Sequence, residues 1–259
     1  MATKKYRLQD VSEPVLYEEF FEYDKVPRAV YEKEAAPLDI PEEFWITDTT
    51  FRDGQQARPP YTVEQIVTLF KFLNRLSGPK GVIRQSEFFL YTDKDKEAVK
   101  KCLELGFDFP QITAWIRAKV EDFQLVKQFE LKETGILTSI SDYHLFLKLK
   151  KTRKEAIDGY INVVKEALNN DIKPRCHFED VTRADFFGVV IPFAQELMKI
   201  SEDSGVPIKI RLCDTMGYGL DNPYAAAPRG VGKIIQLLRK EAGVPAAQLE
   251  WHGHNDFHR

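Results

Sequence analysis

Residues 45–56 read Trp-Ile-Thr-Asp-Thr-Thr-Phe-Arg-Asp-Gly-Gln-Gln, and the interpretation of the whole chain starts from this stretch. Residues 45–49 form a short apolar run of the kind that predicts a strand. The residues after it place a carboxylate, Asp53, beside a fixed cation, Arg52, and follow them with a glycine and two amides. Polar groups at the end of a strand indicate a site, although a solvated, salt-bridged turn fits the same residues.

Beyond this stretch, short apolar runs alternate with longer amphipathic runs. Further strands are expected at residues 82–90, 111–116, 135–140, 173–178, 208–213 and 249–252. Thr62, three residues before Gln65, has the spacing of a capping box and predicts the start of a helix, and Asp93 opens the next one. More helices are expected at residues 120–131, 152–168, 185–204 and 228–241. Glycines follow helical runs where a C-terminal cap favours a positive φ, at Gly106, Gly135, Gly205 and Gly243.

The alternation of strands and helices predicts the α/β class, as a TIM (β/α)8 barrel or an open doubly wound sheet. No GxGxxG follows the first strand, and the polar residues gather at strand ends, which favours the barrel. Only seven strands are expected, so residues 45–259 are predicted to be a catalytic barrel domain without its eighth strand and C-terminal region. Residues 1–44 are predicted to be an extension that packs on the barrel or a partner subunit, with a partly disordered tail as the alternative.

The composition argues against several classes of protein. The formal net charge is −3, and Lys and Arg are interleaved with Asp and Glu, so no basic stripe for nucleic acid is expected. No run is long and apolar enough to span a bilayer, and the first residues lack the apolar core of a signal peptide. The cysteines are isolated and odd in number, which predicts reduced thiols in a cytoplasmic protein.

A second constellation, residues 251–256, reads Trp-His-Gly-His-Asn-Asp and ends the last expected strand. Residues two apart on a strand point the same way, so His252 and His254 can reach one ion together. With the carboxylate of Asp53 they form a facial set for a divalent metal that leaves positions open for substrate. The alternative is an exposed histidine pair.

The other strand ends also carry polar side chains. Taken singly, these fit helix caps or packed hydroxyls, but their shared position suits an anionic, oxygen-rich substrate. They include Arg84, Thr113, Arg117, Ser139, His144, His177, Glu179, Arg183, Asp214 and Thr215.

These segments resemble the motifs of one family, the DRE-TIM metallolyases, which include isopropylmalate, homocitrate and Re-type citrate synthases and HMG-CoA lyases. Residues 48–56 resemble its DTTLRDGxQ motif and residues 252–256 its HxHND motif. Residues 214–217 match DTxG, residues 179–183 match EDxxR, and residues 141–153 resemble the family's strand-four segment. The segments that begin at Arg58, Arg84, Thr113 and Trp251 are most similar to the Re-citrate synthases.

The resemblance implies an acyltransferase that condenses acetyl-CoA with a 2-oxo acid, here oxaloacetate to citrate. It implies a divalent metal, Mn²⁺ or else Mg²⁺, Co²⁺ or Zn²⁺, held by Asp53, His252 and His254, and a homodimer as the assembly. Arg52 would stabilise the developing oxyanion, and His177 and Glu179 are the other catalytic candidates. The expected substrate-binding residues are Gln56, Arg84, Ser139, Arg183 and Thr215.

Other functions stay open at this point. A homocitrate or isopropylmalate synthase, an HMG-CoA lyase-type cleavage and a non-catalytic, truncated barrel each fit the motifs. A biotin-dependent carboxyltransferase shares the barrel and the metal, but no strand end offers an obvious lysine for carbamylation.

Overall fold

The structure is a computed structural model that describes residues 5–19, 29–37 and 40–255. Its strands are β1 (Ile46–Asp48), β2 (Ile83–Phe88), β3 (Gln111–Arg117), β4 (Glu133–Ser139), β5 (Lys173–Glu179), β6 (Lys209–Asp214) and β7 (Leu249–Gly253). Its helices are α1 (Val63–Ser77), α2 (Asp93–Leu103), α3 (Phe123–Gln128), α4 (Arg153–Asn169), α5 (Ile191–Ser204) and α6 (Val231–Glu241).

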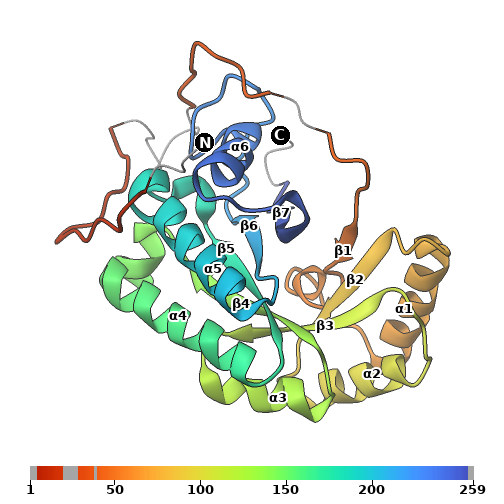
Figure 1. The fold of residues 1–259 in the computed structure, drawn as a ribbon. Coiled ribbons are helices and arrows are strands. Elements are labelled where there is room, and N and C mark those ends of the chain that lie inside the picture. The colour runs from red at the N-terminus through yellow and green to blue at the C-terminus, as the bar shows by residue number, and fades with distance from the viewer. Residues whose placement is uncertain (1–4, 20–28, 38–39, 256–259) are drawn as a thin grey trace. The chain divides into compact units, whose positions relative to one another are not determined.

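Strands and helices alternate along the chain (Figure 1), and the strands pair in chain order from β1 to β7. This is the strand order of a (β/α)8 barrel, of which the described residues contribute seven strands and no eighth. Within the same residues, no helix is long and apolar enough to cross a membrane.

The chain divides into two compact units. The β1–β3 unit comprises Pro41–Ile136 and Glu166–Pro174, and the β5–β7 unit comprises Met1–Ile40, Leu137–Lys165 and Arg175–Arg259. The predicted boundary at residue 44 lies near the end of the first stretch of the β5–β7 unit, at Ile40. The two units are not consecutive along the chain, because the N-terminal segment clusters with the C-terminal half. The assignment of an extension and a catalytic domain stays a prediction.

In the β1–β3 unit, an aromatic cluster holds the segment that follows β1. The strands pair in parallel, with Thr47 opposite Gln85. The rings of Phe51, just after β1, and Phe88, at the end of β2, have centroids 4.8 Å apart, and Phe70 of α1 packs against both. Burial of these apolar rings fixes the backbone immediately before the polar stretch that the sequence singled out.

In the β5–β7 unit, the parallel register aligns Glu179 with Cys213, and Cys213 with His252. Successive side chains of a strand point to opposite faces. Glu179 therefore points away from the face on which Phe178 stacks against Phe193 of α5, with centroids 5.0 Å apart and planes at 15°. One face of β5 packs on the helices, and the other carries the polar side chains.

Some elements differ from their predicted limits. The helix expected at residues 120–131 consists of a 3₁₀ turn, Val120–Asp122, and the short α3, and it ends early because Glu130, at a φ of 54°, turns the chain toward β4. Gly135 lies inside β4 and caps no helix, whereas Gly106, Gly205 and Gly243 have the expected positive φ. The helix expected from residue 185 starts with a π-helical turn, Phe186–Val190, before α5.

The capping box at the start of α1 is confirmed. The Thr62 hydroxyl accepts from the Gln65 N–H at 3.2 Å, and the Gln65 side chain accepts from the Thr62 N–H at 3.0 Å. Thr62→Ala is expected to lower the free energy of unfolding by about 1 kcal/mol, because a helix N–H loses its acceptor. Urea unfolding measures this, with Thr62→Ser as the control that keeps the oxygen. An equal loss in both variants would contradict the capping explanation.

Candidate active site

Arg52 is held between two carboxylates in the β1–β3 unit. Its Nε donates to Glu87 Oε1 at 2.8 Å, and its Nη1 donates to Asp53 Oδ1 at 3.0 Å. Arg52 is 7% exposed and Glu87, on β2, is fully buried. The guanidinium also lies 5.6 Å from the ring centroid of Trp115 on β3. A cation with these neighbours keeps one orientation, which is what stabilisation of a developing negative charge requires.

The turn before Arg52 is built by Asp48 at the end of β1. Its Oδ1 accepts from the N–H and hydroxyl of Thr50 at 3.2 and 2.5 Å, and its Oδ2 accepts from the Ser86 hydroxyl at 2.7 Å. Aspartate favours such turns because its carboxylate can bond the backbone two residues on. The motif residue Asp48 therefore shapes the loop that presents Arg52 and Asp53.

Gln56 and Arg84 were both predicted to bind substrate. Gln56 is exposed beside this turn, and its N–H donates to the Asp53 carbonyl at 3.0 Å. Arg84 lies between two rings, with its guanidinium 4.4 Å from the centroid of Trp45 and 4.6 Å from that of Phe109. Arg84 and Glu87 are three apart on β2 and so point to opposite faces. This geometry does not favour the substrate-binding role of Arg84.

The β5–β7 unit gathers several polar side chains around Glu179, at the end of β5. The Ser139 hydroxyl donates to Glu179 Oε2. His144 Nδ1 lies 2.9 Å from the same oxygen, and Lys148 Nζ lies 3.2 Å from Oε1. Burial would raise the pKa of Glu179, but His144, Ser139 and Lys148 together lower it to about 2. Glu179 is therefore a carboxylate at neutral pH.

Asp180, the next residue, organises a second buried group. It has a positive φ of 67°, which costs energy for a residue with a side chain. Arg183 donates to both of its oxygens, with Nε at 2.8 Å from Oδ1 and Nη2 at 2.7 Å from Oδ2. The Ser141 hydroxyl donates to Oδ2 at 2.5 Å, and the Thr215 hydroxyl accepts from the Asp180 N–H at 2.9 Å. The structure thus brings Ser139 to Glu179, the last residue of β5, and brings Arg183 and Thr215 to Asp180, the residue that follows it.

His252 and His254 come from the end of β7 and the residue after it. Their ring centroids are 5.5 Å apart, and the planes make an angle of 80°. His252 is half-buried and His254 exposed. Two imidazoles at this separation, near a strand end, fit the donor set that a divalent transition metal prefers. Asp53, the third predicted ligand, belongs to the β1–β3 unit, and the aspartate of the HxHND motif, residue 256, lies outside the described residues.

His177 belongs to a deeper layer of β5. It is 1% exposed, and its partner in the parallel register is Arg211 on β6. Glu250 of β7 is paired with two buried cations, with its Oε1 3.1 Å from Arg175 Nε and its Oε2 2.8 Å from Arg211 Nε. Burial would raise the pKa of Glu250, but Arg175 and Arg211 outweigh it and lower the pKa to about 2.

Three residues of these clusters were given no catalytic, binding or metal role from the sequence. Glu87, the buried partner of Arg52, is far from it in the sequence, so no local pattern could pair them. His144 and Lys148 stand in the segment that resembled the family's strand four, but only the π-helical turn Tyr143–Lys148 brings both to Glu179. The sequence signal that could have found this pair is a histidine four residues before a lysine.

Comparison with known proteins adds three findings. The family model described as HMGL-like matches residues 43–258. The Citrate (Re)-synthase of Syntrophus aciditrophicus (strain SB) is 58% identical over 255 residues, which cover 98% of this chain and 40% of that protein. The Citrate (Re)-synthase of Clostridium kluyveri is 53% identical over 253 residues, which cover 98% of this chain and 56% of that protein.

Among solved structures, the hydroxymethylglutaryl-CoA lyase from Pseudomonas aeruginosa superimposes with a TM-score of 0.60 at 17% identity, over 85% of this chain and 71% of that one. At this identity the likeness shows the fold alone, and it confirms the α/β TIM-barrel architecture. The chain spans about half the length of the curated relatives, 40% and 56% of the two synthases.

The two low-pKa glutamates predict how stability depends on pH. Glu179 and Glu250 have an ordinary pKa of 4.5 and a folded-state pKa of about 2. A lowered folded-state pKa stabilises the folded chain above the ordinary value, and this stabilisation is lost as the pH falls through the lower value. The free energy of unfolding is therefore expected to fall between pH 4.5 and about 2. Urea unfolding at a series of pH values measures this.

Glu250→Gln is the test variant for that expectation. It should be less stable than the wild type at neutral pH, because the buried Arg175 and Arg211 lose the anion that they contact. It should also show a shallower loss of stability on acidification, since one of the two carboxylates is gone. Parallel pH curves for the two proteins would rule out Glu250 as a source of the acid sensitivity.

Proposed function

The chain belongs to the HMGL-like family, and on that premise we propose that it is the metal-binding part of an enzyme that condenses acetyl-CoA and oxaloacetate. In this reaction the acetyl methyl carbon adds to the ketone of oxaloacetate, and water cleaves the thioester to release citrate and CoA. The observation that supports it most is the 58% identity with a Citrate (Re)-synthase along 98% of the chain.

His252, His254 and Asp53 are the proposed ligands of the metal. Imidazole and carboxylate donors suit Mn²⁺, and also Co²⁺, Zn²⁺ or Mg²⁺, and the paired rings at the end of β7 support this donor set. When bound, the ion would act as a Lewis acid toward the carbonyl of the 2-oxo acid. Arg52 donates to Asp53 at 3.0 Å and would hold that carboxylate in one orientation.

Arg52 is the proposed stabiliser of the oxyanion that forms when the ketone is attacked. Its charge is permanent, and its hydrogen bond to the fully buried Glu87 keeps the guanidinium from rotating toward solvent. Donors that are held in place before the reaction pay no cost of reorganisation when charge develops.

The pair of His144 and Glu179 is the proposed proton-transfer group of the β5–β7 unit. A carboxylate with a pKa of about 2 is a weak base. Glu179 would therefore orient the imidazole, whose Nδ1 lies 2.9 Å from its Oε2. An imidazole oriented by a carboxylate is a recurrent general base. His177, buried one layer deeper, stays a catalytic candidate.

The second carboxylate of the substrate needs donors that are already in place. Ser139, Arg183 and Thr215 meet around Glu179 and Asp180, and Gln56 is exposed beside Asp53; these four are the proposed binding residues. Arg84 is left out, since it lies between Trp45 and Phe109. A homodimer and a cytoplasmic location complete the proposal, and the latter is supported by Cys102, Cys176 and Cys213, which are buried and form no disulfide within the described residues.

The substrate is tested by measuring thiol release from acetyl-CoA in the presence of Mn²⁺. Oxaloacetate, 2-oxoglutarate and 2-oxoisovalerate are compared, on this chain and on a chimera that continues it with the C-terminal part of the Syntrophus aciditrophicus relative. Release with oxaloacetate alone is expected. Release with 2-oxoglutarate or 2-oxoisovalerate would indicate a homocitrate or isopropylmalate synthase. Cleavage of a hydroxyacyl-CoA without any condensation would overturn the proposal in favour of a lyase.

Arg52→Lys separates catalysis from metal binding. Lysine keeps the charge beside Glu87 but cannot donate to two carboxylates in the fork geometry of arginine. The variant is expected to lose about 10²- to 10³-fold in kcat while Mn²⁺ binding, measured by calorimetry, persists. His252→Gln is the matched variant that should lose Mn²⁺ binding. Near-normal turnover in Arg52→Lys would remove Arg52 from the mechanism.

A further inference from the structure

The β5–β7 unit also contains a buried ionic group, close in sequence to the side chains that contact Glu179. Arg153, the first residue of α4, is completely buried. Its Nε and Nη2 donate to the two oxygens of Asp142 at 2.9 and 2.6 Å, and its Nη1 donates to Asp185 Oδ2 at 3.0 Å. Burial would lower the pKa of Arg153, but the two carboxylates more than offset this and raise it. The guanidinium is therefore a permanent cation clamped by two anions.

The N-terminal segment completes this group with three residues. The Gln9 carbonyl accepts from the same guanidinium at 3.1 Å, and the Val15 N–H donates to Asp142 Oδ2 at 2.5 Å. Burial, followed by the charge and the hydrogen bond of Asp185, raises the pKa of Tyr17. Residues 9–17 thus contact both carboxylates that hold the cation.

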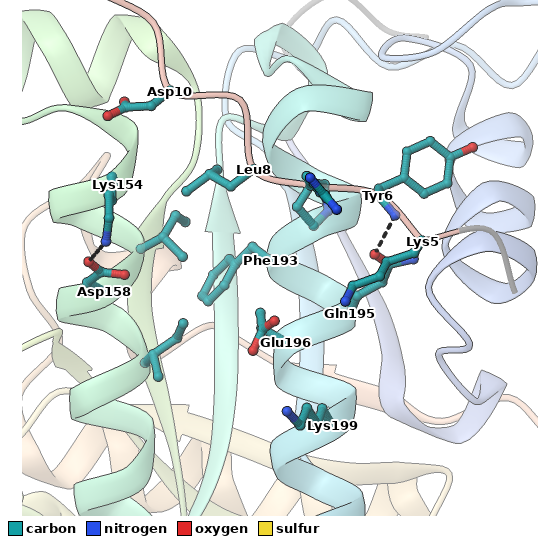
Figure 2. Close-up of a pocket in the computed structure, with 14 residues that line it drawn as sticks. Lys5, Tyr6, Leu8, Asp10, Lys154, Asp158, Phe193, Gln195, Glu196 and Lys199 are labelled. Carbon is teal, nitrogen blue, oxygen red and sulfur yellow. Dashed lines mark hydrogen bonds and ion pairs between the residues drawn. The ribbon is translucent and has the colours of Figure 1, made fainter.

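The same segment is anchored farther along the unit. Figure 2 shows it running across the groove between α4 and α5, with Leu8 directed toward Phe193 and the Tyr6 N–H bonded to Gln195 Oε1 at 3.2 Å. The groove has a volume of about 960 Å³. The Tyr6 hydroxyl also donates to Glu241 of α6 at 3.2 Å. Hydrogen bonds to α5 and α6 fix the segment before it reaches the buried cation.

Asp142 connects this buried group to the proposed site. It immediately precedes the turn Tyr143–Lys148, whose imidazole and ammonium groups contact Glu179. Ser141, on its other side, donates to Asp180. A displacement of Asp142 would therefore move both contacts of the turn with the end of β5.

We propose that Arg153 is a positioning residue for the proposed reaction: by clamping Asp142 it sets the turn that brings His144 and Lys148 to Glu179. Residues 9–17 are part of this clamp. The inference rests on the proposed function for its catalytic consequence, but the position of the turn can be measured without activity.

A purely stabilising role for Arg153 explains this arrangement less well than a positioning role does. Desolvation of two or three charges offsets much of their attraction, so buried ion pairs are weak contributors to net stability. What a guanidinium adds is direction, because its planar fork meets a carboxylate through two parallel bonds. Arg153 meets Asp142 through such a fork, and a lysine ammonium has the charge without the fork.

Arg153→Lys is the decisive variant. Two quantities are measured on the full chain: the kcat and KM of thiol release with oxaloacetate, and the pKa of Glu179 by ¹³C NMR of labelled glutamate, assigned with Glu179→Gln. The variant is expected to lose about 10- to 100-fold in kcat, as for a displacement of about 1 Å at a catalytic group. The pKa of Glu179 should rise from about 2 toward its ordinary value of 4.5.

Two further variants bracket this result. Lys154→Ala removes an exposed ion pair with Asp158 from the next position of α4, and should leave both kcat and the pKa of Glu179 unchanged. Val15→Pro removes the N–H that bonds Asp142 and also fixes φ and replaces the valine side chain, and it should shift both quantities in the same direction as Arg153→Lys, by less. A lower melting temperature in Arg153→Lys with an unchanged pKa of Glu179 would overturn the proposal. If neither the wild-type chain nor the chimera makes citrate, the proposed function fails, and the NMR titration alone decides the positioning role.

Discussion

The pairing of buried guanidinium groups with buried carboxylates is the constraint on which the proposed site depends. A charge removed from water has to meet an opposite charge with good geometry, or the folded state loses several kcal/mol per ion, on the order of a large mutational effect. The chain meets this requirement in the segments that follow β1, β4 and β5, and also within β5, β6 and β7, where the carboxylate, Glu250, is half-buried. The pairs are Arg52 with Glu87, Arg153 with Asp142, Arg183 with Asp180, and Arg175 and Arg211 with Glu250.

These ion pairs fix the loops that follow the strands, which the parallel sheet alone leaves without restraint. Parallel strands bring polar residues to one end of each unit, but the loops after the strands have no regular hydrogen bonds of their own to fix them. Arginine supplies the missing restraint because it donates in a plane and in two directions at once. The loop after β1 is fixed through Glu87 of the neighbouring strand, and the turn after β4 through Arg153 of the following helix.

The N-terminal segment takes part in these pairings through its backbone groups. As sequence it has no period and no motif, and an extension without a role would fit its composition. In the folded chain the Gln9 carbonyl accepts from the buried guanidinium of Arg153, and the Val15 N–H donates to Asp142, which lies two residues before the proposed general base, His144. Backbone groups carry no sequence signature, so a segment can support a site without any recognisable residue.

The sequence by itself determined the alternation of strands and helices, the capping box at Thr62, and the family motifs at residues 48–56 and 252–256, because these are local patterns. It predicted that Ser139, Glu179, Arg183 and Thr215 stand at strand ends, and they meet there. Only the tertiary structure decided that Arg84 lies between two rings, that Glu87 holds Arg52, and that His144 reaches Glu179. These depend on which face of a strand a side chain takes and on partners far apart in the chain, and neither leaves a local pattern.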